Sequence, residues 1–165
     1  MMKNLAFFSL AAVVAFTLAF TNKHSLTVLQ NGNDTIHFAG ETHFANVRQL
    51  TFGGDNAEAY FSYDGKYLVY QYTNTSKGVP CDQIWMGKIP ERADEPFVPK
   101  LVSTGTGRTT CAFFYPDGKH ILYGSTHLGG TECPPVPDRK KYGNKYIWPI
   151  YESFDIFKAD TNGNI

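Results

Sequence analysis

The three cysteines, Cys81, Cys111 and Cys133, carry the most distinctive chemistry in this sequence of 165 residues. No two of them have the Cys-x-x-Cys spacing of a zinc site or a dithiol redox centre. In an oxidising compartment, three thiols allow one disulfide and leave one cysteine over. The five histidines also lack the His-x-x-x-His spacing of a metal site, so we expect no metal ion and no cofactor.

Charged side chains offer a second kind of chemistry. Glu58 provides a carboxylate and Arg108 a guanidinium, which together suit a charged ligand or a peptide terminus. A plain ion pair, or two solvated charges, is the alternative explanation. Residues 105–107, Gly-Thr-Gly, lack the glycine and lysine that follow in a phosphate-binding loop, and no serine nucleophile motif is present. We therefore expect no catalytic residue in the chain.

The first residues resemble a targeting segment. Lys3 precedes an apolar stretch over residues 5–20, which is shorter than a comfortable membrane span of about 20 residues. Small residues at positions 17 and 19 predict a signal peptide over residues 1–19, cleaved after Ala19, with an uncleaved anchor as the alternative. We expect a periplasmic or secreted protein with no transmembrane helix in the mature chain.

The overall composition excludes one class of partner and favours one fold class. Lys plus Arg and Asp plus Glu both number 15, so no net field attracts a polyanion, and nucleic acid is not expected as a partner. Aromatic residues make up 15% of the chain, which also has 15 glycines. This combination is typical of strands joined by tight turns and predicts an all-β fold.

An internal repeat is the most informative pattern. Residues 59–70, AYFSYDGKYLVY, recur 53 positions later as residues 112–123, AFFYPDGKHILY. Each copy flanks an Asp-Gly step with aromatic and aliphatic residues, and such a step supplies the positive φ of a hairpin turn. Each copy therefore predicts a β-hairpin. Alternation places Ala57, Ala59 and Phe61 on one face of the first strand.

Further strands complete the repeat. Residues 83–86 and 155–158 predict a third strand in each copy, and residues 100–103 and 47–52 predict additional strands. Four short strands recurring every 40 to 50 residues or so are the signature of a β-propeller with four-stranded antiparallel blades. The segment over residues 26–38, with its Asn-Gly step, predicts one more hairpin.

Three motifs resemble the repeats of TolB-like (WD40-like) propellers: RQLTF at residues 48–52, the Asp-Gly-Lys turns, and DIFKADTNG at residues 155–163. The resemblance implies an N-terminal extension over residues 20–46 and propeller blades over residues 47–165. The first blade spans about residues 53–103, and the second about residues 108–165 with an insertion at 126–148. Because a closed ring needs at least four blades, we expect an incomplete ring and an N-terminal fragment of a longer protein.

In such a blade the first strand lies innermost, so several chain segments meet at one rim of the disc. We expect the binding surface there, at the mouth of the channel. Its candidate residues are Asp55, Glu58, Asp82, Arg108, Thr109 and Trp148. Cys111 matches the position of Glu58 and shares the rim with Cys81 and Cys133, so a disulfide from Cys111 to either neighbour is geometrically reasonable, and the pairing stays open.

The resemblance implies a non-enzymatic scaffold that binds an envelope protein, a peptide or a glycan. An alternative is a propeller that gates a downstream hydrolase, of the prolyl-oligopeptidase or amidohydrolase kind, whose catalytic residues would follow residue 165. For a glycan, Trp148, Tyr146 and Tyr151 offer stacking platforms. The other explanation for these rings is that they pack the insertion onto its own blade.

Overall fold

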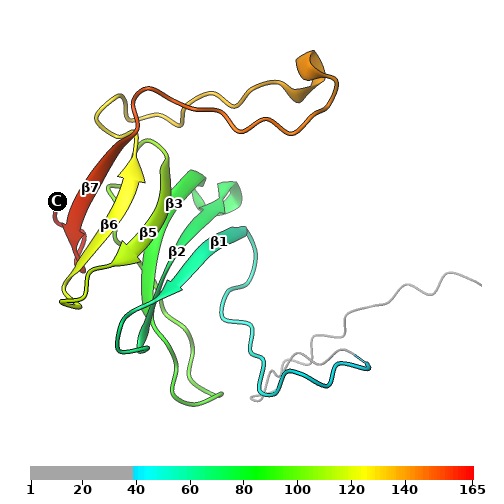
Figure 1. The fold of residues 1–165 in the computed structure, drawn as a ribbon, viewed down its shortest axis with the longest axis vertical. Helices are drawn as coiled ribbons and strands as arrows, with labels where there is room; N and C mark the ends of the chain where they lie inside the picture. The colour runs from blue at the N-terminus through cyan, green and yellow to red at the C-terminus, as the bar shows by residue number, and fades with distance from the viewer. Residues whose placement is uncertain (1–38) are drawn as a thin grey trace, which may run out of the picture.

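The protein is all-β. The computed structural model describes residues 39–165, which form two antiparallel sheets (Figure 1). The first sheet has the order β1 (Asp55–Phe61), β2 (Tyr67–Asn74), β3 (Val79–Lys88) and β4 (Lys100–Leu101), and the second β5 (Thr109–Phe114), β6 (His120–Ser125) and β7 (Asp155–Asp160). Two short 3-10 helices, η1 (Thr75–Lys77) and η2 (Arg139–Tyr142), lie between strands. The predicted signal peptide and the hairpin over residues 26–38 fall outside the described residues.

Both predicted hairpins are confirmed, and the Asp-Gly steps form their turns. In the first turn the Asp64 carboxylate accepts hydrogen bonds from Ser62 Oγ at 2.6 Å and from the backbone N of Lys66 at 3.1 Å. The next residue, Gly65, has a φ of +69°, which a residue without Cβ adopts at no steric cost. The predicted third strands are also present, as parts of β3 and β7.

The first strand of each sheet contains the same irregularity. In β1 the register shifts between Ala57 and Tyr60, and in β5 it shifts between Thr110 and Ala112. These shifts are β-bulges, in which an extra residue on one strand has no partner on the other. The expected alternation of Ala57, Ala59 and Phe61 on one face is therefore wrong, because a bulge interrupts it.

The two sheets pack face to face around one hydrophobic core. The first sheet contributes Val69, Ile84 and Met86, and the second contributes Ile121 and Tyr123 among others, all of them buried. A tilted ring pair, Tyr60 with Phe113 at 4.2 Å between centroids, joins β1 to β5. This packing fixes the positions of the strand ends, where the candidate site lies.

The strand expected over residues 47–52 is not formed. Arg48 alone makes an isolated bridge, and its guanidinium donates to the backbone carbonyls of Pro90 and Arg92, at 2.9 Å each. These bonds hold the segment along the β3–β4 loop instead of in a sheet. The fourth strand, expected over residues 100–103, is shorter and ends at Leu101.

A long connection, residues 126–154, joins β6 to β7 and is here called the arm. It is a surface loop, as expected for the insertion, and it extends across the ends of the strands (Figure 1). Its base is tied down where the backbone N of Gly107 donates to the carbonyl of Thr131 at 2.9 Å. Its two legs are joined where the Tyr151 hydroxyl donates to the carbonyl of Pro135 at 2.9 Å.

Candidate functional site

A hollow of about 520 Å³ lies between the arm and residues of β1, β2, β3 and β5, and we call it the arm pocket. The sheets supply its polar wall, and the arm supplies a mostly aromatic and aliphatic wall. From the sheets it is lined by Glu58, Gln71, Asp82, Arg108, Thr109 and Cys111. From the arm the side chains that matter most are Arg139, Tyr146, Trp148 and Tyr151.

The structure brings together five of the six residues expected at the rim. Glu58, Asp82, Arg108, Thr109 and Trp148 all line the arm pocket. The sixth residue, the exposed Asp55 at the start of β1, does not line it.

Asp55 pairs with Thr73 close to η1, and this places it beyond the edge of the arm pocket.

An ion pair at the pocket wall links the two sheets. Arg108 Nη1 lies 3.2 Å from Asp82 Oδ2, and the two side chains are 24% and 27% exposed. The Asp82 carboxylate also accepts a hydrogen bond from Thr73 Oγ1 at 2.7 Å, and its backbone carbonyl accepts one from Thr109 Oγ1 at 2.9 Å. Both ions are thus held in position before any ligand arrives.

Glu58 and Arg108 were expected to act together, but each has a different partner. The Glu58 carboxylate accepts a hydrogen bond from the Tyr60 hydroxyl, which raises the pKa of Tyr60 because the bond favours the protonated phenol. Arg108 pairs with Asp82, and its Nε is buried with no hydrogen-bond partner among the described residues. A buried N–H without a partner costs stability, and this atom has almost no accessible surface through which a ligand could reach it.

The disulfide does not involve Cys111, although the rim geometry made such a pairing reasonable. Cys81 is bonded to Cys133, with 6.0 Å between their Cα atoms, and Cys111 is a partly exposed free thiol. The arm carries Cys133 over the start of β3, where Cys81 lies, whereas the backbone of Cys111 is fixed at the bulge. The count of one disulfide and one remaining cysteine is confirmed.

Gln71 is a site residue that the sequence reasoning missed. Its side chain is almost fully buried, and its Oε1 accepts hydrogen bonds from the backbone N of Cys111 at 2.6 Å and from Thr110 Oγ1 at 3.1 Å. It therefore satisfies a backbone donor that the bulge leaves without a ladder partner. The available signal was a lone amide inside the apolar run of β2.

The aromatic residues of the arm divide into two kinds. Trp148 is 74% exposed and Tyr146 68% exposed, and their rings meet edge to face with centroids 6.3 Å apart. The Arg139 guanidinium lies 5.0 Å from the centre of the Tyr146 ring. Tyr151 instead bonds to Pro135 and packs against Phe154 at 6.1 Å, so its role is to hold the arm together. Packing onto the sheet does not account for Trp148 and Tyr146.

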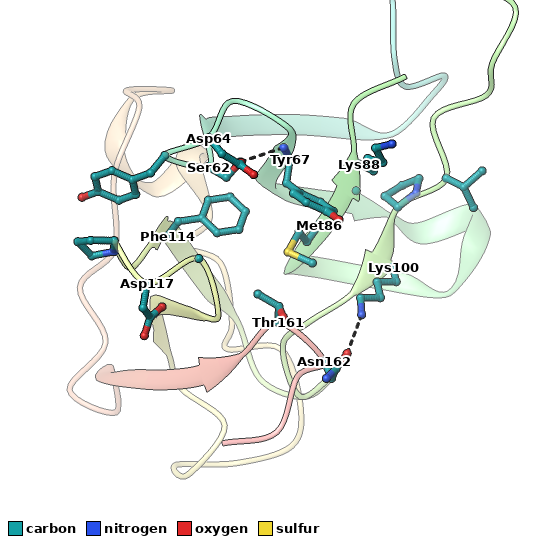
Figure 2. A pocket seen from close by; sticks show the side chains of 16 residues that line it. Ser62, Asp64, Tyr67, Met86, Lys88, Lys100, Phe114, Asp117, Thr161 and Asn162 are labelled. Atoms are coloured by element: carbon teal, nitrogen blue, oxygen red, sulfur yellow. Dashed lines mark hydrogen bonds between the residues drawn. The ribbon is translucent and has the colours of Figure 1, made fainter. Parts of the chain in front are cut away.

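A second hollow, of about 640 Å³, lies between the Asp-Gly turns at the other end of the sheets (Figure 2). Figure 2 shows that its polar groups are bonded within the chain, with Ser62 joined to the turn around Asp64 and Lys100 Nζ donating to Asn162 Oδ1 at 3.1 Å. The backbone N–H of Lys119, aided by His120, lowers the pKa of Asp117 to about 2. These contacts serve the turns, so the arm pocket is the candidate site.

Residues 39–165 contain neither a cluster of metal-ligating side chains nor a membrane-spanning helix. No three His, Cys, Asp or Glu side chains in this part of the chain are grouped as metal ligands. The helices described there are short 3-10 turns, and neither is long and apolar enough to cross a bilayer.

Comparison with known proteins gives no match: no protein-family model, curated protein or solved structure is significantly similar to this chain.

Proposed function

We propose that this chain is part of an exported β-propeller scaffold without enzymatic activity, which binds an envelope protein, a peptide or a glycan in the arm pocket. The observation that carries the proposal is that the arm pocket has a polar wall facing an aromatic one. One wall holds polar groups that are already fixed by protein partners, and the other presents the exposed Trp148 and Tyr146. A concave site with a few oriented polar groups beside aromatic surface is the usual form of a binding site.

The relation between the sheets supports the propeller part of the proposal. The pairing register of β2 with β3 is the same as that of β6 with β7. Val69 and Ile84 of the first sheet therefore correspond to Leu122 and Ile156 of the second. Ile84 is fully buried against the second sheet, whereas its counterpart Ile156 is 76% exposed. The two sheets therefore use opposite faces in their contact, as in a head-to-tail arrangement. The face of the second sheet that carries Ile156 is left free to receive a further unit.

The Cys81–Cys133 disulfide supports export, because disulfides persist in oxidising compartments such as the periplasm. It ties the arm to β3 and so holds the two walls of the arm pocket together. A site whose walls are linked in this way loses less conformational entropy when a ligand binds.

A binding screen tests the proposal. The oxidised, purified chain is screened against a peptide library, a glycan array and envelope proteins. We expect a saturable ligand whose affinity falls at least about tenfold in Trp148→Ala and in Arg108→Gln, a loss of about 1.4 kcal/mol. Tyr142→Ala is the matched control, because Tyr142 is an exposed aromatic residue of the arm outside the pocket lining. Equal affinity in all four proteins, or no ligand at all, would overturn the proposal.

A further inference from the structure

We infer that the arm pocket takes a neutral oligosaccharide, an inference that rests on the function proposed above. Two features of the pocket argue for this class of ligand: the balance of its charges and the open aromatic faces of the arm.

The charges in the pocket are balanced and largely engaged. Four charged side chains line it, namely Glu58, Asp82, Arg108 and Arg139, so the formal charges cancel. Arg108 is paired with Asp82, and Arg139 lies over the ring of Tyr146. A phosphate, a uronic acid or a peptide carboxylate would need a cation that is free of such partners. An ionic ligand would thus have to break an existing contact, whereas a neutral one would not.

The ion pair instead suits a hydroxyl group. A hydroxyl both donates and accepts, so one sugar hydroxyl can donate to a carboxylate and accept from a neighbouring N–H. The wall offers both partners close together: the Asp82 carboxylate lies 3.2 Å from Arg108 Nη1, and both side chains are about a quarter exposed. Vicinal hydroxyls of a sugar ring fit such an alternation of acceptor and donor.

The arm provides the apolar half of the contact. One face of a pyranose ring carries mostly C–H groups, and an exposed indole offers a flat apolar surface with a polar edge. Trp148 is 74% exposed, and Tyr146 stands at 89° to it, so the two rings form a corner. Because Arg139 lies over Tyr146, Trp148 is the open stacking platform.

Tryptophan fluorescence gives a direct test. The chain has two tryptophans, so Trp85→Phe leaves Trp148 as the only reporter. The probes are cellohexaose, mannohexaose and chitohexaose as neutral sugars, oligogalacturonate as an acidic sugar, and a peptide library. We expect at least one neutral hexasaccharide to shift the Trp148 emission to the blue in a saturable way. The affinity should change less than about twofold between 50 and 500 mM salt, because no net charge is neutralised.

Variants separate stacking from a general effect on the fold. Trp148→Ala should lose at least about tenfold in affinity for the sugar, as measured by calorimetry, and Trp148→Tyr should recover part of the loss. Tyr142→Ala should bind as the parent does. Binding of acidic sugars or peptides alone, dependent on Trp148, would overturn the sugar inference and leave the proposed function standing. Binding of none of these probes would overturn the sugar inference, and the screen against envelope proteins described above would then decide the proposed function.

Discussion

Glu58 and Cys111, 53 positions apart in the chain, occupy the same place in the two sheets and share an unusual backbone. Both lie at a bulge in the first strand of a sheet, with φ of 49° and 40°, in the left-handed region that side chains other than glycine rarely adopt. Both line the arm pocket. Such conformations cost about 1 to 3 kcal/mol each and are found mainly at functional sites, which supports the choice of this pocket.

The first prediction concerns this strain. Replacing Glu58 by glycine removes the steric cost of the left-handed conformation but increases the freedom of the unfolded chain. We expect Glu58→Gly to leave the free energy of unfolding unchanged or to raise it by up to about 1 kcal/mol. Glu58→Val should lower it by about 1 to 2 kcal/mol, because a β-branched residue fits this conformation poorly. Urea unfolding followed by circular dichroism measures both, and a glycine variant less stable than the valine variant would contradict the prediction.

The second prediction concerns the disulfide between Cys81 and Cys133, which closes a loop across a sequence separation of 52. In the chain-entropy model a loop of this length contributes about 4 kcal/mol of stability. We expect the double variant Cys81→Ala and Cys133→Ala to lose about 2 to 5 kcal/mol in urea unfolding. Cys111→Ser, which leaves the disulfide intact, should change the free energy of unfolding by less than about 1 kcal/mol.

Thiol counting checks the pairing itself. The oxidised, denatured chain should show one reactive thiol, and the reduced chain should show all three. In the Cys111→Ser variant the oxidised chain should show none. A disulfide involving Cys111 would instead leave Cys81 or Cys133 reactive, which peptide mapping after thiol labelling would identify.

The sequence predicted the hairpins well because their signal is local. An Asp-Gly step between two apolar runs sets both the turn and the strands beside it, and Asp64 and Asp117 each hold their own turns. Five of the six candidate residues lie together at the arm pocket. For those on the sheets this follows because equivalent positions of a repeat lie close together when the sheets pack. The strand expected over residues 47–52 belongs to neither of the two sheets, and its segment is held by bonds from Arg48 to the distant residues Pro90 and Arg92.

The remaining errors have a common physical origin in non-local contacts. Alternation of apolar residues carries no mark of the bulges at Glu58 and Cys111, so the faces of β1 could not be assigned by counting. The partner of Cys81 depends on the direction in which the arm leaves β6, and this is set by the bond from Gly107 to Thr131. The choice of Asp82 as the partner of Arg108 likewise depends on how the two sheets pack.

The third prediction concerns acid stability. Hydrogen bonds from the backbone N–H of Lys119 and from His120 lower the pKa of Asp117 from 3.8 to about 2. A pKa that is lower in the folded state contributes stability above the unfolded value, and this contribution is lost as the pH falls from about 4 to about 2. The pKa of Asp64 and that of Asp160 are lowered too, each mainly by a side-chain hydrogen bond, from Ser62 and Asn164 respectively. We expect the urea midpoint to fall over this pH range.

The control for the acid effect is Asp117→Asn, which cannot titrate. Its urea midpoint should be lower than that of the parent at pH 6, and the difference should shrink as the pH approaches 2, because the parent loses the same charged acceptor there. A parent and a variant whose midpoints fall in parallel from pH 4 to pH 2 would show that Asp117 does not supply the acid sensitivity.

The fourth prediction compares two neighbouring glycines at the base of the arm. A Cβ built on Gly129 would overlap the Cβ of Ser153 in the opposite leg, whereas a Cβ on Gly130 would meet nothing within 4 Å. Gly129→Ala must therefore push the legs apart, and we expect it to lower the free energy of unfolding by about 1 to 3 kcal/mol. Gly130→Ala should leave it unchanged or raise it by up to about 1 kcal/mol. Equal urea midpoints for the two variants would mean that the legs are not packed together at this point.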